Sequence, residues 1–109
     1  MKKWPLSLFA VLALVGFQHP ASADEAALKP CKNCHDITPA KKTIVGPPLF
    51  GVFGGKPTID GVPFEVWDEK SLDAWEKNPQ AVKKKAKMLF RTPNEAKRKA
   101  IIEALKELK

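Results

Sequence analysis

Hydrophobic positions recur at helical spacing in two stretches of the second half of the chain. The first stretch reads WDEKSLDAWEKNP, in which Asp68 can cap a helix and Glu69 lies in its first turn. Leu72 and Trp75 fall on one face, and Pro79 ends the pattern. The sequence therefore predicts a short amphipathic helix between Asp68 and Pro79.

The second stretch, RTPNEAKRKAIIEALKELK, has a stronger start signal. Thr92 is expected to be the N-cap and Pro93 the first helical residue, with Glu95 three residues after the cap. The apolar positions that follow predict one buried face along a C-terminal helix. They are Ala96, Ala100, Ile101, Ala104, Leu105 and Leu108.

The remainder of the chain shows neither the helical nor the strand period. Residues 24–30 can form at most a turn or two of helix before Pro30, and TPAKKTIVGPPLFGVFGGKPTIDGVPF is rich in proline and glycine. No stretch alternates cleanly enough to predict a sheet, and no internal repeat divides the chain. These features predict one all-α domain with long loops.

Residues 1–23 have the three parts of a secretory signal peptide. Two lysines follow the first methionine, an apolar run comes next, and Ala-Ser-Ala ends at Ala23. The alternative is a membrane anchor, but the apolar run is too short for a spanning helix. We therefore expect cleavage after Ala23, a mature domain of residues 24–109, location in the bacterial periplasm and no stable membrane insertion after cleavage.

Composition and charge narrow the choice of function. The chain has 109 residues, of which 44% are hydrophobic and 28% charged, as expected for one small globular domain. A domain of this size has a thin core and often depends on a cofactor, a metal or a disulfide. The formal net charge is +7, yet nucleic acid is a poor candidate partner, because the chain is exported and its aromatic residues are not interleaved with its basic runs.

The candidate chemistry lies in CKNCH, residues 31–35. A redox thiol pair also uses C-x-x-C, but it normally occurs in a strand–helix–strand setting, which is not visible here. A zinc site needs four ligands, and Cys31, Cys34 and His35 supply only three. C-x-x-C-H is the signature of covalent haem attachment, in which each thiol adds to a vinyl group and the histidine reaches the iron. The motif favours haem.

Three further segments accompany this motif: VGPPLFGVFGG, VWDEKSLDAWEKNP and KAKMLF. With them, the chain resembles the small class I c-type cytochromes over nearly all of residues 24–109. The resemblance implies an all-α cytochrome c fold, in which helices and loops wrap around one covalently bound haem c. Only a few residues precede Cys31 in the mature chain, so the N-terminal helix of the family is expected to be short or missing.

The resemblance also implies the residues that hold the cofactor. Cys31 and Cys34 would carry the thioether bonds, and His35 and Met88 would be the axial ligands of the iron. They are the only histidine and methionine left after removal of residues 1–23.

Two residues are implied to support these ligands. The carbonyl of Pro47 would accept the second N–H of the proximal histidine, and the indole N–H of Trp67 would reach a haem propionate. Trp75 falls where the family often has a tyrosine near the sixth ligand. One departure is that Lys84-Lys85 stands where the family usually has Pro-Gly, so we expect a looser loop before Met88.

The implied function is single-electron transfer, not enzymatic catalysis, because two axial ligands leave the iron no position for a substrate. Lysines near the ligand methionine and near the attachment motif would steer acidic redox proteins, such as a periplasmic dehydrogenase, a cytochrome complex or a terminal oxidase or reductase. Two alternatives remain open: a dedicated cytochrome subunit of a periplasmic dehydrogenase, and a haem protein with an open iron site for a small ligand. The lysines are Lys41, Lys42, Lys83, Lys84, Lys85 and Lys87.

Overall fold

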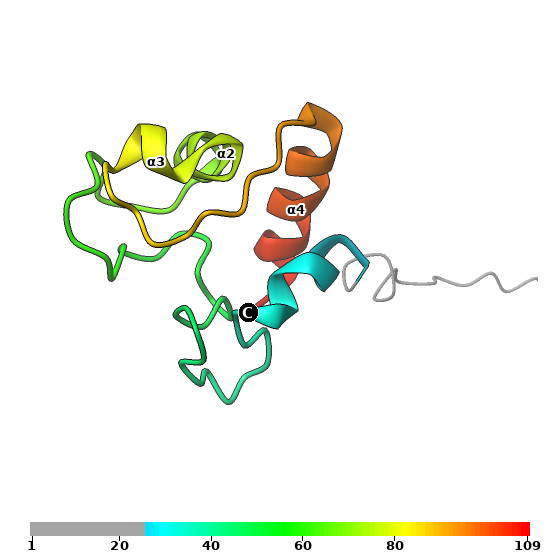
Figure 1. The fold of residues 1–109 in the computed structure, drawn as a ribbon. Helices are drawn as coiled ribbons and strands as arrows, with labels where there is room; N and C mark the ends of the chain where they lie inside the picture. Colours follow the sequence, from blue (N-terminus) through cyan, green and yellow to red (C-terminus); the bar gives the residue numbers. More distant parts are fainter. Residues whose placement is uncertain (1–25) are drawn as a thin grey trace, which may run out of the picture.

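The computed structural model describes residues 26–109, so the predicted signal peptide of residues 1–23 lies outside the described residues. Four helical elements are present in the described part: η1 (Lys29–Asn33), α2 (Glu69–Lys77), α3 (Pro79–Val82) and α4 (Glu95–Glu107). Long loops join them, and residues 26–109 contain no strand (Figure 1). The predicted all-α class is confirmed. None of the described helices is long and apolar enough to cross a membrane.

Helix α2 begins as its capping residues predict. The backbone N–H of Ser71 donates to the Asp68 carboxylate at 2.9 Å, and the Asp68 N–H donates to the Ser71 hydroxyl at 2.8 Å. The backbone N–H and the hydroxyl of Ser71 both donate to the Asp68 carboxylate, and these two hydrogen bonds lower the pKa of its carboxyl. At the other end, Asn78 closes α2 and caps α3, in which Pro79 takes the first position. Two short helices therefore meet at one Asn-Pro pair.

Helix α4 begins two residues later than predicted. Its N-cap is Asn94, whose side chain accepts the backbone N–H of Lys97 at 2.9 Å. The expected cap, Thr92, is buried and its N–H donates to the backbone carbonyl of Glu76 at 2.8 Å. The prediction of Thr92 as N-cap was therefore wrong: the backbone of Thr92 joins the loop to α2 instead.

The buried face of α4 also differs from the predicted one. Ala96 and Ala100 are exposed and Leu108 is only half-buried. The buried positions recur at the i, i+3, i+4 spacing, but they start at a charged residue, which the apolar pattern did not include. They are Arg98, Ile101, Ile102, Ala104 and Leu105.

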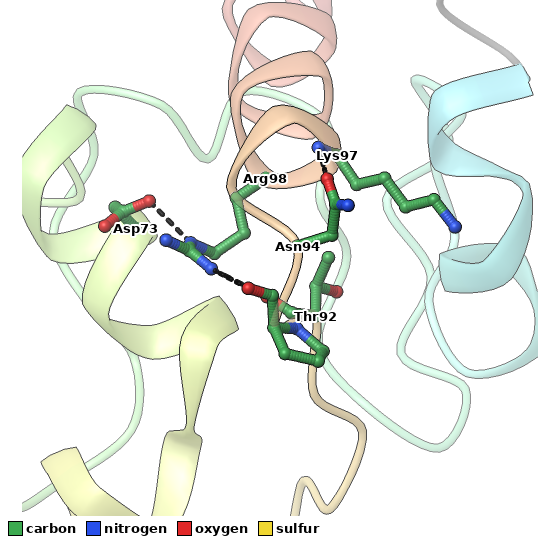
Figure 2. A network of polar contacts seen from close by, with 6 residues as sticks. Asp73, Thr92, Asn94, Lys97 and Arg98 are labelled. Atoms are coloured by element: carbon green, nitrogen blue, oxygen red, sulfur yellow. Dashed lines mark hydrogen bonds and ion pairs between the residues drawn. The ribbon is translucent and has the colours of Figure 1, made fainter.

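Arg98 joins α4 to α2 inside the protein. Its side chain is 6% exposed, and its Nε–H donates to the Asp73 carboxylate at 2.7 Å. Its Nη1 donates to the backbone carbonyls of Thr92 at 3.0 Å and Pro93 at 2.8 Å. Figure 2 shows the guanidinium between Asp73 on α2 and the loop before α4. The guanidinium is buried while the Asp73 carboxylate is partly exposed, so the three hydrogen bonds of Arg98 compensate for the loss of its hydration.

The core lies where α4, α2 and the N-terminal segment meet. Leu28 is 1% exposed and packs in one cluster with Trp67, Leu72 and the buried apolar residues of α4. Residues 26–28 are helical and continue directly into η1 (Figure 1). In the described residues the N-terminal helix is thus a short segment, held to the core by Leu28.

Candidate functional site

The two cysteines and the histidine lie on one tight turn. Element η1 places Cys31 one turn before Cys34, and the N–H groups of Cys34 and His35 both donate to the Cys31 carbonyl, at 3.1 and 2.9 Å. Both thiols are free. The pKa of the Cys31 thiol is raised to about 11. Burial is the largest cause, and the negative charges of Glu76 and Cys34 add to it. A redox-active cysteine pair normally has the opposite property, a lowered thiol pKa.

A loop segment pairs with this turn and positions the imidazole of His35. The Gly46 N–H donates to the Cys34 carbonyl at 2.7 Å, and the Leu49 N–H donates to the Asp36 carbonyl at 2.9 Å. The carbonyl of Pro47, which lies between them, is 2.6 Å from Nδ1 of His35. This is the contact that the resemblance implied. With the proton on Nδ1, Nε2 keeps its lone pair for a metal ion.

Gly46 lies directly against the imidazole. A Cβ atom built on Gly46 would be 2.5 Å from Cε1 of His35 and 2.9 Å from Nδ1. Real side chains do not approach so closely, so only glycine fits unless the ring moves. Gly46 lies in the VGPPLFGVFGG segment, where the sequence assigned it no role, and the structure shows that it leaves room for His35.

Met88 is in contact with the indole of Trp75, which lies on α2. Nε1–H of Trp75 donates to the Met88 sulfur at 3.1 Å. Trp75 in turn meets Trp67 edge to face, with ring centroids 5.7 Å apart. Trp67 is 8% exposed, and its backbone is hydrogen-bonded on both sides to Gly54 and Gly55. Trp75 therefore orients the methionine sulfur and is itself packed against the buried Trp67.

The structure brings the expected site residues together in two groups. One contains Cys31, Cys34, His35 and Pro47, and the other contains Trp67, Trp75 and Met88. Both groups border the same core, because Trp67 belongs to it and Cys31 and Trp75 pack against it.

The loop before Met88 contains a strained residue. The Ala86 N–H donates to the Lys83 carbonyl at 2.9 Å, which makes residues 83–86 a turn. Lys85, at the third position of this turn, has φ of 65°. A positive φ at that position favours glycine, and Pro-Gly is a preferred pair for the middle of such a turn. The Lys84-Lys85 departure from the family pattern thus places a left-handed lysine close to Met88.

Two buried charged residues were missed by the sequence analysis. Glu76 on α2 is 8% exposed, and its Oε1 atom is buried without a hydrogen-bond partner. Arg98 on α4 is the second. A signal for both exists in the sequence, because Glu76 follows Leu72 by four residues and Arg98 precedes Ile101 by three. Each charge therefore lies on an apolar helix face.

These side chains fit the chemistry of a covalently attached haem. The two free thiols lie one helical turn apart, the imidazole of His35 is oriented through Nδ1, and the thioether of Met88 is oriented by an indole N–H. Within residues 26–109, no group of three or more His, Cys, Asp or Glu side chains is arranged to hold a metal ion.

No family model matches the chain. Among curated proteins, it is 34% identical to "Cytochrome c2" of Blastochloris viridis, in an alignment covering 83% of this chain and 80% of the relative. It is 31% identical to "Cytochrome c2 iso-1" of Rhodospirillum centenum, with 75% and 90% covered. Among solved structures, it matches "cytochrome cH from Methylobacterium extorquens" with a TM-score of 0.66 and 35% identity, covering 80% of this chain and 97% of that structure.

Proposed function

Because the chain belongs to the class I c-type cytochromes, we propose that it carries single electrons between redox proteins of the periplasm, with His35 and Met88 as the axial ligands of its haem iron. The family assignment makes it a mono-haem electron carrier, not an enzyme, with one covalently attached haem c. The proposal adds the ligands, the compartment and the kind of partner.

The His35–Pro47 hydrogen bond carries the assignment of the proximal ligand. At 2.6 Å it fixes the ring orientation and leaves Nε2 as the open nitrogen. The haem, when bound, supplies a one-electron couple at its iron. Cys31 and Cys34 anchor it on the same turn, so that the imidazole meets it from one side.

The Trp75–Met88 contact supports the assignment of the second ligand. The indole N–H donates to one lone pair of the sulfur, which holds the thioether in place and leaves its other lone pair for the metal. Leu49, Phe53 and Phe90 were expected to lower the polarity around the haem; Leu49 and Phe53 are half-buried against the core, whereas Phe90 is 47% exposed and does not pack there. Thioether ligation and a low local polarity both favour the reduced state, so we expect a moderately positive reduction potential. Trp67 is proposed to donate its indole N–H to a haem propionate.

An exposed basic surface supports encounter with acidic redox partners. The two residues that follow the proposed ligand in the sequence, Leu89 and Phe90, are 70% and 47% exposed. Charge on such a surface raises association rates and makes them depend on salt. The lysines proposed for docking are the exposed Lys41, Lys42, Lys84, Lys85 and Lys87 and the half-buried Lys83.

Two experiments test this function. Reduced and oxidised spectra of the protein with and without CO test the ligands, because a filled iron does not bind CO rapidly. The rate of electron transfer to an acidic redox protein should fall with ionic strength, and a Lys84→Glu, Lys87→Glu variant should lose most of that dependence. A Lys97→Glu, Lys99→Glu variant, which changes two exposed lysines on α4, is the control for the same change in net charge. Rates independent of salt would contradict the docking role, and copurification with a larger subunit would favour a dedicated enzyme subunit.

A further inference from the structure

Glu76 occupies a position on α2 that an apolar side chain would normally fill. It lies four residues after Leu72, and both are buried, at 8% and 4% exposed. Its Oε1 atom is shielded from solvent and has no hydrogen-bond partner. An ionised carboxylate in such a place loses its hydration without compensation, whereas a protonated carboxylic acid is tolerated much better.

The charged groups around Glu76 do not neutralise it. On its own helix, Asp73 is another carboxylate, and α3, with the sequence PQAV, has no titratable side chain. From α4, Arg98 is the only cation that acts on Glu76, but it is already bonded to Asp73 and to two backbone carbonyls. Burial and then Asp73 raise the pKa of the Glu76 carboxyl to about 8, while Arg98 acts in the opposite direction.

Glu76 also lies within electrostatic reach of the cofactor anchor. After burial, the charge of Glu76 is the next cause of the raised pKa of the Cys31 thiol on η1, and Cys31 packs against the same core that Glu76 on α2 borders. Cys31 is one of the two residues that fit the covalent attachment of the haem. A charge close enough to act on this thiol is also close enough to act on the group bonded to it.

We propose that Glu76 is a proton-binding site coupled to the electron that the protein carries. In the reduction, a donor protein supplies one electron to the haem iron, and the Glu76 carboxylate takes one proton from the solvent and forms one O–H bond. In the oxidation, the electron passes to an acceptor protein and the proton returns to the solvent. This inference rests on the proposed electron-transfer function and adds a proton to it.

The sign of the coupling follows from electrostatics. An added electron makes the haem less positive by one charge, so protonation of Glu76 is easier in the reduced state than in the oxidised state. The midpoint potential should therefore fall as the pH rises between the two values at which Glu76 titrates. The full slope for one proton per electron is about 59 mV per pH unit, which corresponds to a tenfold change in a one-electron equilibrium constant. Outside that window the potential should be constant.

The test is a spectroelectrochemical titration of the haem-loaded protein from about pH 5 to about pH 10, on both sides of the pKa of about 8. The wild type should show the slope, Glu76→Gln should show a flat profile, and Glu65→Gln, which removes an exposed glutamate, should behave as the wild type. A flat wild-type profile would overturn the proposal, and so would a slope that persists in Glu76→Gln.

Infrared spectroscopy and the Glu76→Leu variant provide a second measurement and a second substitution. The reduced-minus-oxidised infrared spectrum of the wild type near pH 8 should gain a protonated carboxyl band that is lost in Glu76→Gln. Glu76→Leu replaces the buried carboxyl by an apolar group and serves if Glu76→Gln does not fold. Absence of the band from the wild type would refute proton binding. Rapid CO binding would instead contradict the ligand assignment, and the pH profile would still decide the role of Glu76.

Discussion

Gly46→Ala tests whether the loop beside CKNCH orients the proximal histidine. The new Cβ would be 2.5 Å from Cε1 of His35, whereas carbon atoms in contact are about 3.5 Å apart, so the ring must move by about 1 Å. Such a shift stretches the 2.6 Å contact between Nδ1 and the Pro47 carbonyl beyond hydrogen-bond length. Overpacking costs about 1–3 kcal/mol and the lost hydrogen bond about 1 kcal/mol.

The effect on the metal site can be separated from the effect on stability. Loss of a bond that orients a ligand typically weakens metal binding about 10- to 100-fold. Protons compete with iron for the imidazole, so the acid pH at which His35 leaves the iron should rise by about 1–2 pH units. The absorption spectrum during an acid titration of the oxidised protein measures this midpoint.

Gly54→Ala is the matched control for this experiment. Gly54 has φ of 84°, so alanine strains the backbone there, but nothing lies within 4 Å of its new Cβ. The control should lose stability in denaturant and keep the wild-type acid midpoint. An unchanged acid midpoint in Gly46→Ala would refute the orienting role of the loop.

Three further predictions concern Met88, Lys85 and Glu76. Met88→Ala should make the reduced protein bind CO at once and lose its far-red iron–sulfur band, and an unchanged spectrum would exclude this residue as a ligand. Lys85→Gly should raise the free energy of unfolding in urea by about 0.5–1 kcal/mol, because φ is 65° there, whereas Lys84→Gly should lower it. Above the ordinary carboxyl pKa of 4.5 the unfolded chain loses the proton of Glu76, whereas the folded protein keeps it up to about pH 8. The free energy of unfolding should therefore fall between these two pH values, by up to about 5 kcal/mol, and then level off. Denaturant titrations of Glu76→Gln should lack this fall, and a fall of equal size would contradict the buried carboxyl.

Local signals were sufficient for helix α2 and insufficient for the start of α4. The capping box of Asp68 and Ser71 uses residues three positions apart, so the sequence contains all its information. Before α4, both Thr92 and Asn94 are good N-cap residues. The choice between them depends on tertiary contacts, because Thr92 is buried and bonded to α2 through Glu76.

Haem attachment at CKNCH was predicted from the motif, and the roles of Pro47, Trp67 and Met88 were implied by the resemblance; periodicity predicted none of them. The His35–Pro47 bond joins residues twelve positions apart, and loop conformation alone brings them together. The charges at Glu76 and Arg98 were overlooked because a pattern analysis reads charged residues as exposed positions. Their helical spacing from apolar residues is present in the sequence, but the packing of α2 against α4 establishes their burial, as the Arg98–Asp73 pair at 2.7 Å shows.

The most direct test of the account is optical spectroscopy of the purified protein in both redox states, before and after addition of CO, followed by extraction with acidified acetone. If the haem is covalently attached, it stays with the protein through Cys31 and Cys34. The oxidised form should have the weak far-red iron–sulfur band, and CO should leave the reduced spectrum unchanged. Retained haem that binds CO at once would contradict ligation by Met88, and haem that is lost to the solvent would contradict the covalent site itself.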